Sequence, residues 1–348
     1  QQKIRELEKQ AGSMQAILEN MAEGVIALDA QTRITSFNPA AEKIFVLQKK
    51  EAEGRFFLEA IRNNSIAEVI SKVLADKNAV SQEIELVWPL QKIFQVNVSP
   101  LFENAAVNGC LLVIHDITEL RKLERIRRDF VANVSHELKT PLTSIKGFVE
   151  TLLEGALDDK AHNRDFLQII QRHSERLNSL VDDLLSLSHL ESKEIILNQK
   201  SFNLRQQLEE IIAGFKAQLK KRNIGIKNEL PTGISLSADQ DKIGQVFTNL
   251  IDNAIKFNQE NGFIRIYAEK INGGVKIMVE DSGIGIPERE IPRIFERFYR
   301  VDKARSRELG GTGLGLSIVK HIIDLHQGSV GVESVEGLGS KFWFILPG

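Results

Sequence analysis

The sequence contains one cysteine, Cys110, so the chain cannot close an intramolecular disulfide, and its fold suits a reducing compartment. It has no excess of one charge, because 45 Lys and Arg against 47 Asp and Glu give a formal net charge of −2. That balance argues against a protein that coats nucleic acid. The sequence also lacks any apolar run approaching about 18 residues, so no segment is predicted to span a bilayer.

The length of 348 residues is too great for one ordinary core and indicates two or three domains. Apolar residues make up 42% and charged residues 26%, a balance typical of folded domains rather than of extensive disorder. The chain begins at Gln1 and has no signal-peptide pattern. We therefore expect a fragment from which an N-terminal part has been removed.

The first residues carry apolar side chains at alternating steps of three and four, the spacing of a parallel coiled-coil seam. An ordinary amphipathic helix is the alternative, because so short a pattern does not distinguish the two. We predict a signalling coiled-coil helix over residues 1–15. The seam consists of Ile4, Leu7, Ala11, Met14, Leu18 and Met21.

From Glu23 the apolar period changes to two, which indicates strands. Strands, then helices, then three further strands predict a small α+β domain of roughly 100 residues. The expected strands are 25–29, 34–37, 84–90, 93–98 and 110–115, and the expected helices are 40–45 and 66–74.

This region resembles a PAS sensory domain over residues 16–118, on the strength of residues 38–42 (NPAAE) and 116–118 (DIT) before a charged helix. The resemblance implies a pocket that holds a flavin, a haem, a small metabolite or nothing. Cys110 lies between Gly109 and Leu111, so the Asn-Cys-Arg signature of flavin-adduct photosensors is absent. The ligand stays unknown from the sequence.

Two long helices are predicted at residues 119–155 and 161–191, joined by a short turn at 155–160. An apolar stripe runs along the second helix, and a single hairpin would leave that stripe half open. Two copies would close it into a four-helix bundle, so burial predicts a homodimer. Beyond about residue 195, helices at 204–219 and 240–257 alternate with strands at 224–230, 264–269, 275–279, 329–333 and 341–346, which predicts a layered α/β sandwich.

The first chemical motif, residues 135–142 (SHELKTPL), lies inside the first long helix. The imidazole of His136 could accept and release a phosphoryl group near neutral pH. Glu137 could hydrogen-bond one ring nitrogen and leave the other as the nucleophile. Pro141 removes a helical hydrogen bond, so we expect a bend there. A solvent-facing histidine beside an incidental proline is the alternative.

The second motif places Asn249, Asn253 and Lys256 on one face of a helix. Carboxamide oxygens suit a hydrated Mg²⁺ that bridges phosphates, so Asn253 and Asn249 are the candidate metal residues. Lys256 would supply positive charge to those phosphates. A polar stripe on a surface helix is the alternative.

Two glycine-rich segments follow, residues 281–287 (DSGIGIP) and 310–316 (GGTGLGL), and neither is a Walker motif. Asp281 could accept a hydrogen bond from an exocyclic amine such as that of adenine. The second segment opens a helix and could present backbone N–H groups to phosphate oxygens. Between them, residues 294–300 (IFERFYR) with Lys303, Arg305 and Arg307 predict a basic, mobile lid, or else a plain charged loop.

In this order and spacing, the segments from about Leu120 to Gly348 resemble the H, N, first G, F and second G boxes of sensor histidine kinases of two-component systems. The resemblance implies a multidomain α+β fold. Its parts would be the coiled coil, the PAS domain, an antiparallel hairpin at 119–194 that forms a dimeric four-helix bundle, and a GHKL-type α/β sandwich at 195–348.

The resemblance also implies the ligands and site residues. The catalytic residues would be His136, Glu137 and Thr140, with Thr140 positioning water for dephosphorylation of a partner. ATP and Mg²⁺ would bind at Asn249, Asn253, Lys256, Asp281, Gly283, Gly285, Arg300, Gly311, Thr312, Gly313, Leu314 and Gly315.

Two other functions fit a GHKL fold, a direct ATPase and a non-catalytic scaffold. Such ATPases activate water with a glutamate four residues before the metal-binding asparagine, where this chain has Asn249. A carboxamide has no useful basicity, so hydrolysis should be slow. A scaffold would show degraded boxes, and these boxes are intact.

The expected reaction transfers the γ-phosphoryl group of ATP to His136, with Glu137 as base and with Lys256 and Arg300 offsetting charge. The phosphoryl group would then pass to an aspartate in the receiver domain of a response regulator. No nucleic-acid partner is expected. The domain order is most similar to membrane-tethered, phosphate-sensing kinases. From the abrupt start at Gln1 we expect this chain to be a cytoplasmic portion, attached to the membrane only through the missing N-terminal region of a bacterial protein.

Overall fold

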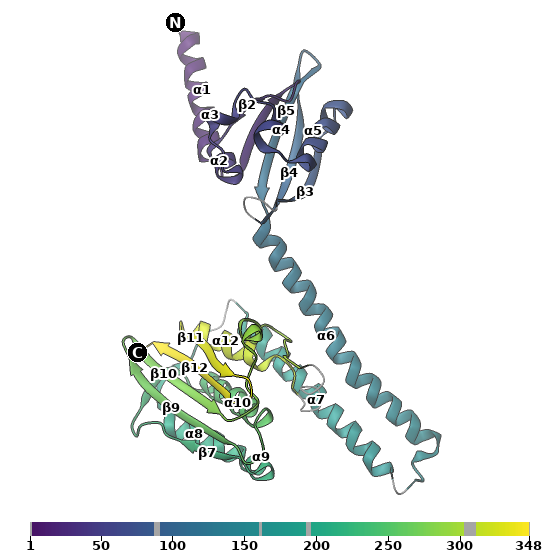
Figure 1. Ribbon diagram of the computed structural model, residues 1–348, viewed down its shortest axis with the longest axis vertical. Helices are drawn as coiled ribbons and strands as arrows, with labels where there is room; N and C mark the ends of the chain where they lie inside the picture. Colours follow the sequence, from purple (N-terminus) through teal and green to yellow (C-terminus); the bar gives the residue numbers. More distant parts are fainter. Residues whose placement is uncertain (1, 87–90, 160–161, 193–195, 303–310, 348) are drawn as a thin grey trace. The chain divides into compact units, whose positions relative to one another are not determined.

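The computed structural model describes residues 2–86, 91–159, 162–192, 196–302 and 311–347. They divide into two compact units, Gln1–Asp129 and Phe130–Gly348 (Figure 1). Several sequence predictions fall outside the described residues: the end of the strand at 84–90, Lys160 and Ala161 at the helical turn, residue 195, and Lys303, Arg305, Arg307 and Gly310 of the lid and second glycine segment.

The N-terminal unit is an antiparallel five-stranded sheet in the order β2-β1-β5-β4-β3, with helices packed against it (Figure 1). It begins with helix α1, which forms as predicted, whereas its pairing with a second copy stays a prediction. The other elements are β1 (Gly24–Asp29), β2 (Ile34–Phe37), α2 (Pro39–Phe45), α3 (Lys49–Ala52), α4 (Phe57–Ile61), α5 (Asn64–Asp76), β3 (Val80–Leu86), β4 (Lys92–Glu103) and β5 (Ala106–Asp116), after α1 (Gln2–Asn20).

Asn38 holds the start of this unit together. Its side-chain oxygen accepts hydrogen bonds from the backbone N–H groups of Val25 (2.8 Å) and Ala41 (2.9 Å), and so caps α2. Its Nδ2 donates to the carbonyl oxygens of Leu18 (3.1 Å) and Glu23 (2.9 Å). One buried amide therefore ties α1, β1 and α2 to each other.

Helix α6 (Thr118–Thr151) and helix α7 (Asn163–Leu190) form the predicted hairpin, with a π-helical turn at Leu152–Ala156 after α6. The aromatic rings of Phe148 and Phe166 pack across the hairpin, 5.6 Å apart. Helix α6 runs through Pro141 without interruption. The hydroxyl of Thr140 donates to the carbonyl oxygen of His136 (3.0 Å), a local hydrogen bond beside the proline.

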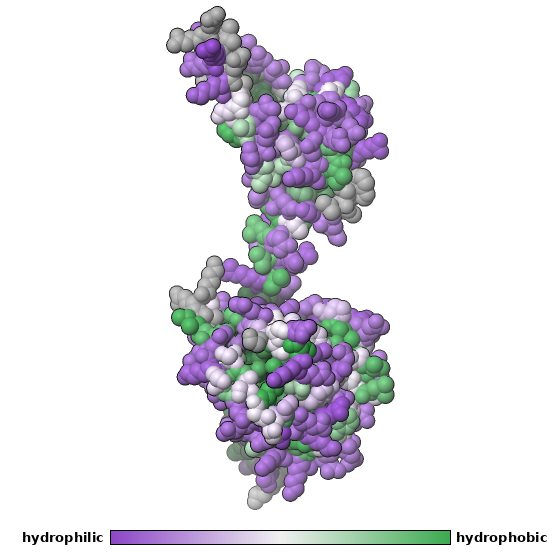
Figure 2. Space-filling view, turned by 90° about the vertical axis from the view of Figure 1, so that its left-hand side faces the viewer, coloured by the Kyte–Doolittle hydropathy of each residue, from purple (hydrophilic) through white to green (hydrophobic). Residues whose placement is uncertain are grey.

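Apolar side chains remain on the open surface of the hairpin. Leu153 is 78% exposed, Leu167 53% and Leu185 64%. At the start of α6, where Figure 2 shows hydrophobic surface, Leu120, Leu123 and Ile126 are also exposed. No helix in the described ranges is both long and apolar enough to cross a bilayer.

The C-terminal sandwich (residues 196–347) has a five-stranded sheet, in the order β11-β12-β10-β9-β7, that is covered on one face by helices α8, α10 and α12 (Figure 1). A separate two-stranded sheet pairs β6 with β8. The elements are β6 (Gln199–Asn203), α8 (Leu204–Gly214), α9 (Lys216–Arg222), β7 (Gly225–Asn228), β8 (Ser235–Asp239), α10 (Gln240–Lys256), β9 (Phe263–Ile271), β10 (Gly274–Asp281), a 3₁₀ turn (Glu288–Arg293), α12 (Gly315–Leu325), β11 (Ser329–Val335) and β12 (Gly339–Pro347).

The prediction of one helix over 204–219 is wrong, because α8 ends at Gly214 and α9 starts at Lys216. Between them Phe215 leaves helical geometry (φ −93°, ψ 0°), next to a glycine with low helix propensity. Helix α10 forms as predicted. Asp239 caps it by accepting from Lys242 N–H, and its apolar stripe is buried under the sheet.

We predict that Asn38→Ala destabilises the N-terminal unit by about 2–4 kcal/mol, because it removes a helix cap and leaves buried backbone donors unpaired. Native-state amide exchange of β1 and α2, read by mass spectrometry, measures the effect. Asn108→Ala is the matched control, because its amide bonds only to exposed Glu103. Equal protection of β1 in the two variants would contradict this role.

Candidate functional site

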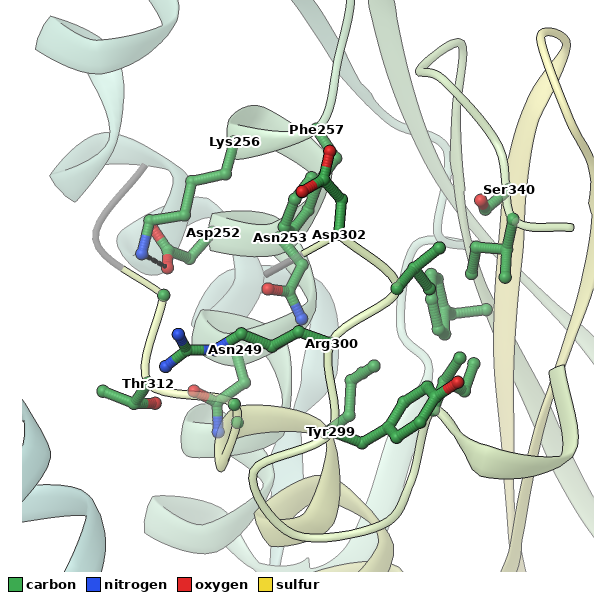
Figure 3. A pocket seen from close by; sticks show the side chains of 18 of the residues that line it. Asn249, Asp252, Asn253, Lys256, Phe257, Tyr299, Arg300, Asp302, Thr312 and Ser340 are labelled. Atoms are coloured by element: carbon green, nitrogen blue, oxygen red, sulfur yellow. Dashed lines mark ion pairs between the residues drawn. The ribbon is translucent and has the colours of Figure 1, made fainter. Parts of the chain in front are cut away.

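A pocket of about 350 Å³ lies in the C-terminal unit, a volume within the usual range for small-molecule sites. Its wall combines segments far apart in sequence: the end of α7, the C-terminal half of α10, the end of β10, the chain before α12 and the start of α12. Figure 3 shows labelled side chains of α10, of the chain before α12 and of Ser340 in β12 around one space.

The α10 wall carries the predicted polar face. Asn249, Asn253 and Lys256 all line the pocket, and in Figure 3 they project from one side of the helix. The Lys256 ammonium pairs with Asp252 one turn earlier (2.7 Å). Nδ2 of Asn249 is buried without a hydrogen-bond partner in the described part of the chain. A buried orphan amide beside a cavity suits a polar ligand.

Asp281 ends β10 and forms the floor of the pocket next to Ser340 of β12. Its carboxylate accepts from the Gly283 N–H (2.8 Å). Burial raises the pKa of Asp281 from 3.8 to about 6, although the hydrogen bonds from Gly283 and Ser340 act in the opposite direction. The group is therefore a desolvated acceptor, which favours the ligand contact that the sequence predicted for it.

Two glycines of the predicted boxes need glycine for backbone reasons. Gly285 has φ +67°, and a Cβ there would lie 2.0 Å from the Val335 carbonyl oxygen. Gly313 has φ +78°, and a Cβ there would lie 2.9 Å from the Cα of Phe298. The second segment thus packs tightly under the lid residues and opens α12 toward the pocket, which also touches Gly311, Thr312 and Gly315.

Two of the predicted binding residues do not line the pocket. Gly283 lies beside it and holds Asp281 through its backbone N–H. Leu314 is fully buried in the core, and its N–H donates to the hydroxyl of Thr312 (3.3 Å). These two positions support pocket residues rather than face the cavity.

The H-box residues lie outside the pocket. The His136 side chain is exposed on α6. The Glu137 carboxylate accepts from Arg176 of α7 (2.8 Å) and from Arg300 of the predicted lid (3.1 Å), whereas it was expected at the His136 ring. Arg300 itself lines the pocket, so one guanidinium group connects the H-box helix with the pocket wall.

Sequence reasoning missed the contribution of α7. Ser179 and Asp183 line the pocket, and the Asp183 carboxylate accepts from the Thr312 hydroxyl (2.6 Å). Neither residue belongs to a recognisable motif, and both lie on a helix whose sequence signal is its apolar stripe. Their role is visible only once α7 packs on the sandwich.

Comparisons with known proteins match this architecture along the chain. Residues 238–348 match the family of histidine kinase-, DNA gyrase B- and HSP90-like ATPases. Residues 126–193 match the His Kinase A (phospho-acceptor) domain, and residues 12–117 match the PAS fold. A sensor protein kinase WalK of Staphylococcus aureus is 35% identical over 343 residues, which is 98% of this chain and 82% of that relative. The chain belongs to the sensor histidine kinase family.

The chain spans 56% of the length of other WalK relatives, such as that of S. aureus strain Newman, again at 35% identity over 98% of this chain. Among solved structures, the histidine kinase ThkA in complex with response regulator protein TrrA matches 95% of this chain and 97% of that chain (30% identity, TM-score 0.53). The Acinetobacter baumannii histidine kinase AdeS covers 61% of this chain and 97% of its own (27% identity, TM-score 0.50). The predicted PAS, hairpin and GHKL-type folds are thereby confirmed.

A kinase of this family uses ATP, and the pocket residues fit Mg-ATP. They offer neutral carboxamides, two cationic side chains, a glycine loop at a helix start and a buried carboxylate. Within the described residues no cluster of three or more His, Cys, Asp or Glu side chains could hold a metal alone.

We predict that Asp281→Asn changes the pH dependence of stability. The folded-state pKa of about 6 lies above the ordinary 3.8, so the ionised carboxylate costs stability above pH 6, and the cost fades as the pH falls toward 3.8. The cost is roughly 3 kcal/mol at pH 8, with about half regained by pH 5. The carboxamide introduced by this substitution would keep an acceptor for the Gly283 N–H without the charge.

The measurement is the thermal midpoint of the C-terminal unit at pH 8 and at pH 5. At pH 8 the thermal midpoint of Asp281→Asn should lie above that of the unsubstituted chain. At pH 5 this difference should be about half as large. Asp241→Asn, at an exposed aspartate of α10, is the control and should follow the unsubstituted profile. A pH-independent difference for Asp281→Asn would show that the buried charge carries no such cost.

Proposed function

We propose that this chain is the core of a sensor histidine kinase that transfers the γ-phosphoryl group of ATP to His136 and then to an aspartate of a response regulator. One observation carries the proposal. Three motifs that are separate in sequence, those of Asn249, Asp281 and Thr312, meet in one pocket, in the same unit as the His136 helix.

The proposed nucleotide pose follows from the donors of the pocket. Asp281 would accept the adenine amine, and the glycine segment at the start of α12 would donate backbone N–H groups to phosphate oxygens. Lys256 and Arg300 would neutralise phosphate charge. Mg²⁺ would polarise the phosphoryl group that is transferred, with Asn253 and Asn249 orienting its water shell.

His136 would act as the nucleophile through the ring nitrogen that faces the phosphorus. Since Glu137 is paired with Arg176 and Arg300, it must release at least Arg300 before it can act as a base at His136. Asn249 offers no basic group for activating water, which disfavours direct hydrolysis. The site therefore supports transfer to a protein side chain better than an ATPase.

Partners follow from the family and from the open surface of the hairpin. Leu167, Val181 and Leu185 share an exposed face of α7, which a second copy would bury in a four-helix bundle. ThkA was solved with a response regulator, and we propose such a partner for this chain. Thr140, one helical turn after His136, would position water when the kinase dephosphorylates that partner.

The domain limits 1–15, 16–118, 119–194 and 195–348 stay part of the proposal, as does a cytoplasmic position in a membrane-anchored bacterial protein. The phosphate-sensing type and the PAS ligand stay sequence-based expectations.

We predict that incubation with γ-labelled ATP and Mg²⁺ labels the chain, and that His136→Gln abolishes at least about 99% of the label, because no other group replaces the nucleophile. The label should be stable to base and labile to acid. His189→Gln, an exposed histidine of α7, is the matched control and should keep the label. Steady phosphate release from both variants without labelled protein would establish an ATPase instead.

We also predict that the double variant Leu167→Glu, Leu185→Glu is monomeric, because charges on both positions oppose burial in a bundle. Light scattering should give the 39.1 kDa chain mass for this variant and twice that mass for the unsubstituted chain. Gln168→Glu with Ser188→Glu adds the same charge at exposed polar positions of α7 and should stay dimeric. A monomeric unsubstituted chain would rule out the bundle.

A further inference from the structure

Asp183 brings a negative charge into a pocket proposed for a triphosphate. Its carboxylate accepts a hydrogen bond from the Thr312 hydroxyl (2.6 Å), within the glycine segment assigned to phosphate oxygens. Lys256, another group assigned to phosphates, lowers the pKa of the same carboxylate through its positive charge. The Thr312 hydroxyl is thus already engaged by a side chain of the hairpin, while the Lys256 ammonium pairs with Asp252.

The surroundings of Asp183 make this contact sensitive to charge. Burial raises the pKa of Asp183, while the Thr312 hydrogen bond and Lys256 lower it, and the neighbouring Asp182 and Asp252 raise it further. Charges in such a half-buried setting interact more strongly than they do in water. An arriving phosphate would meet a like charge at close range.

A second hairpin carboxylate repeats the arrangement. Glu137 of α6 accepts from Arg300, which is also proposed for phosphate, and the two side chains are only 14% and 6% exposed. Each hairpin helix therefore places one carboxylate against a group that the nucleotide would need.

The position of Asp183 is fixed because residues before and after it in α7 pack against the C-terminal sandwich. Leu180, Leu187 and Leu190 are buried in the core of the C-terminal sandwich. Nε2 of His321 bonds to the carbonyl oxygen of Leu190 (3.0 Å), and Gln245 Nε2 donates to the Ser186 hydroxyl (2.7 Å). Asp183 can leave Thr312 only by a side-chain rotation or by partial release of α7.

We propose that Asp183 is a nucleotide-opposing residue, whose carboxylate competes with the terminal phosphates of ATP for the Thr312 hydroxyl. The inference rests on the proposed function, since it requires that the pocket binds a nucleoside triphosphate. Docking of α7 and nucleotide binding then weaken each other. By linkage the effect is reciprocal: a bound nucleotide reduces the free energy of α7 docking by the same amount as docked α7 reduces the free energy of nucleotide binding.

The test is equilibrium binding of a non-hydrolysable ATP analogue with Mg²⁺ to the full chain. Asp183→Asn keeps the side-chain shape and removes the charge, and should tighten binding about fivefold or more, the lower range of coupling between linked sites. Asp183→Ala should also tighten it, which guards against a fold defect in one variant. Asp182→Asn, an exposed neighbour on α7 without a hydrogen bond to Thr312, should change the affinity much less than either Asp183 variant.

A second readout follows the helix itself. In the unsubstituted chain the analogue should increase amide exchange of residues 180–190, and in Asp183→Asn that increase should be smaller. Binding that is equal in Asp183→Asn, Asp183→Ala and Asp182→Asn, or weaker in both Asp183 variants, would overturn the inference and leave the kinase proposal standing. Failure of every variant to bind the analogue would instead overturn the proposed function, and the inference with it.

Discussion

Leu180, Leu187 and Leu190 of α7 are almost completely removed from water by the C-terminal sandwich. Burying side chains of this size contributes roughly 1.5–3 kcal/mol each, far more than an exposed ion pair. This apolar contact brings Asp183 to Thr312, and the same unit brings Glu137 to Arg300. The polar chemistry of the site thus depends on where an apolar helix face packs.

The same packing explains why the H box and the pocket are coupled. Arg300 is a wall residue of the pocket and also a partner of the carboxylate next to His136. If Arg300 binds both the Glu137 carboxylate and a nucleotide phosphate, binding of one anion changes the affinity of the guanidinium group for the other. Under the proposed function, nucleotide binding, release of Glu137 from Arg300 and release of the hairpin would belong to one equilibrium rather than to separate steps.

Sequence periodicity predicted the elements with strong patterns and failed where the pattern was weak. Helix α10 and the strands of both main sheets formed where alternation or a helical stripe was clear. The short pair β6 and β8 was missed, because its residues are mostly polar and carry little strand propensity. The break at Phe215 was missed because the apolar residues keep a helical spacing across Gly214, whereas the backbone leaves helical geometry there.

The sequence by itself determined the chemical inventory: an imidazole beside a carboxylate, two carboxamides one helical turn apart, and two glycine-rich segments. Such features depend on residue type and local spacing, both of which can be read directly from the sequence. Only the tertiary structure decided that Glu137 meets two guanidinium groups, that burial raises the pKa of Asp281, and that Asp183 enters the pocket. Those outcomes arise from contacts between distant segments and from loss of water, neither of which local spacing encodes.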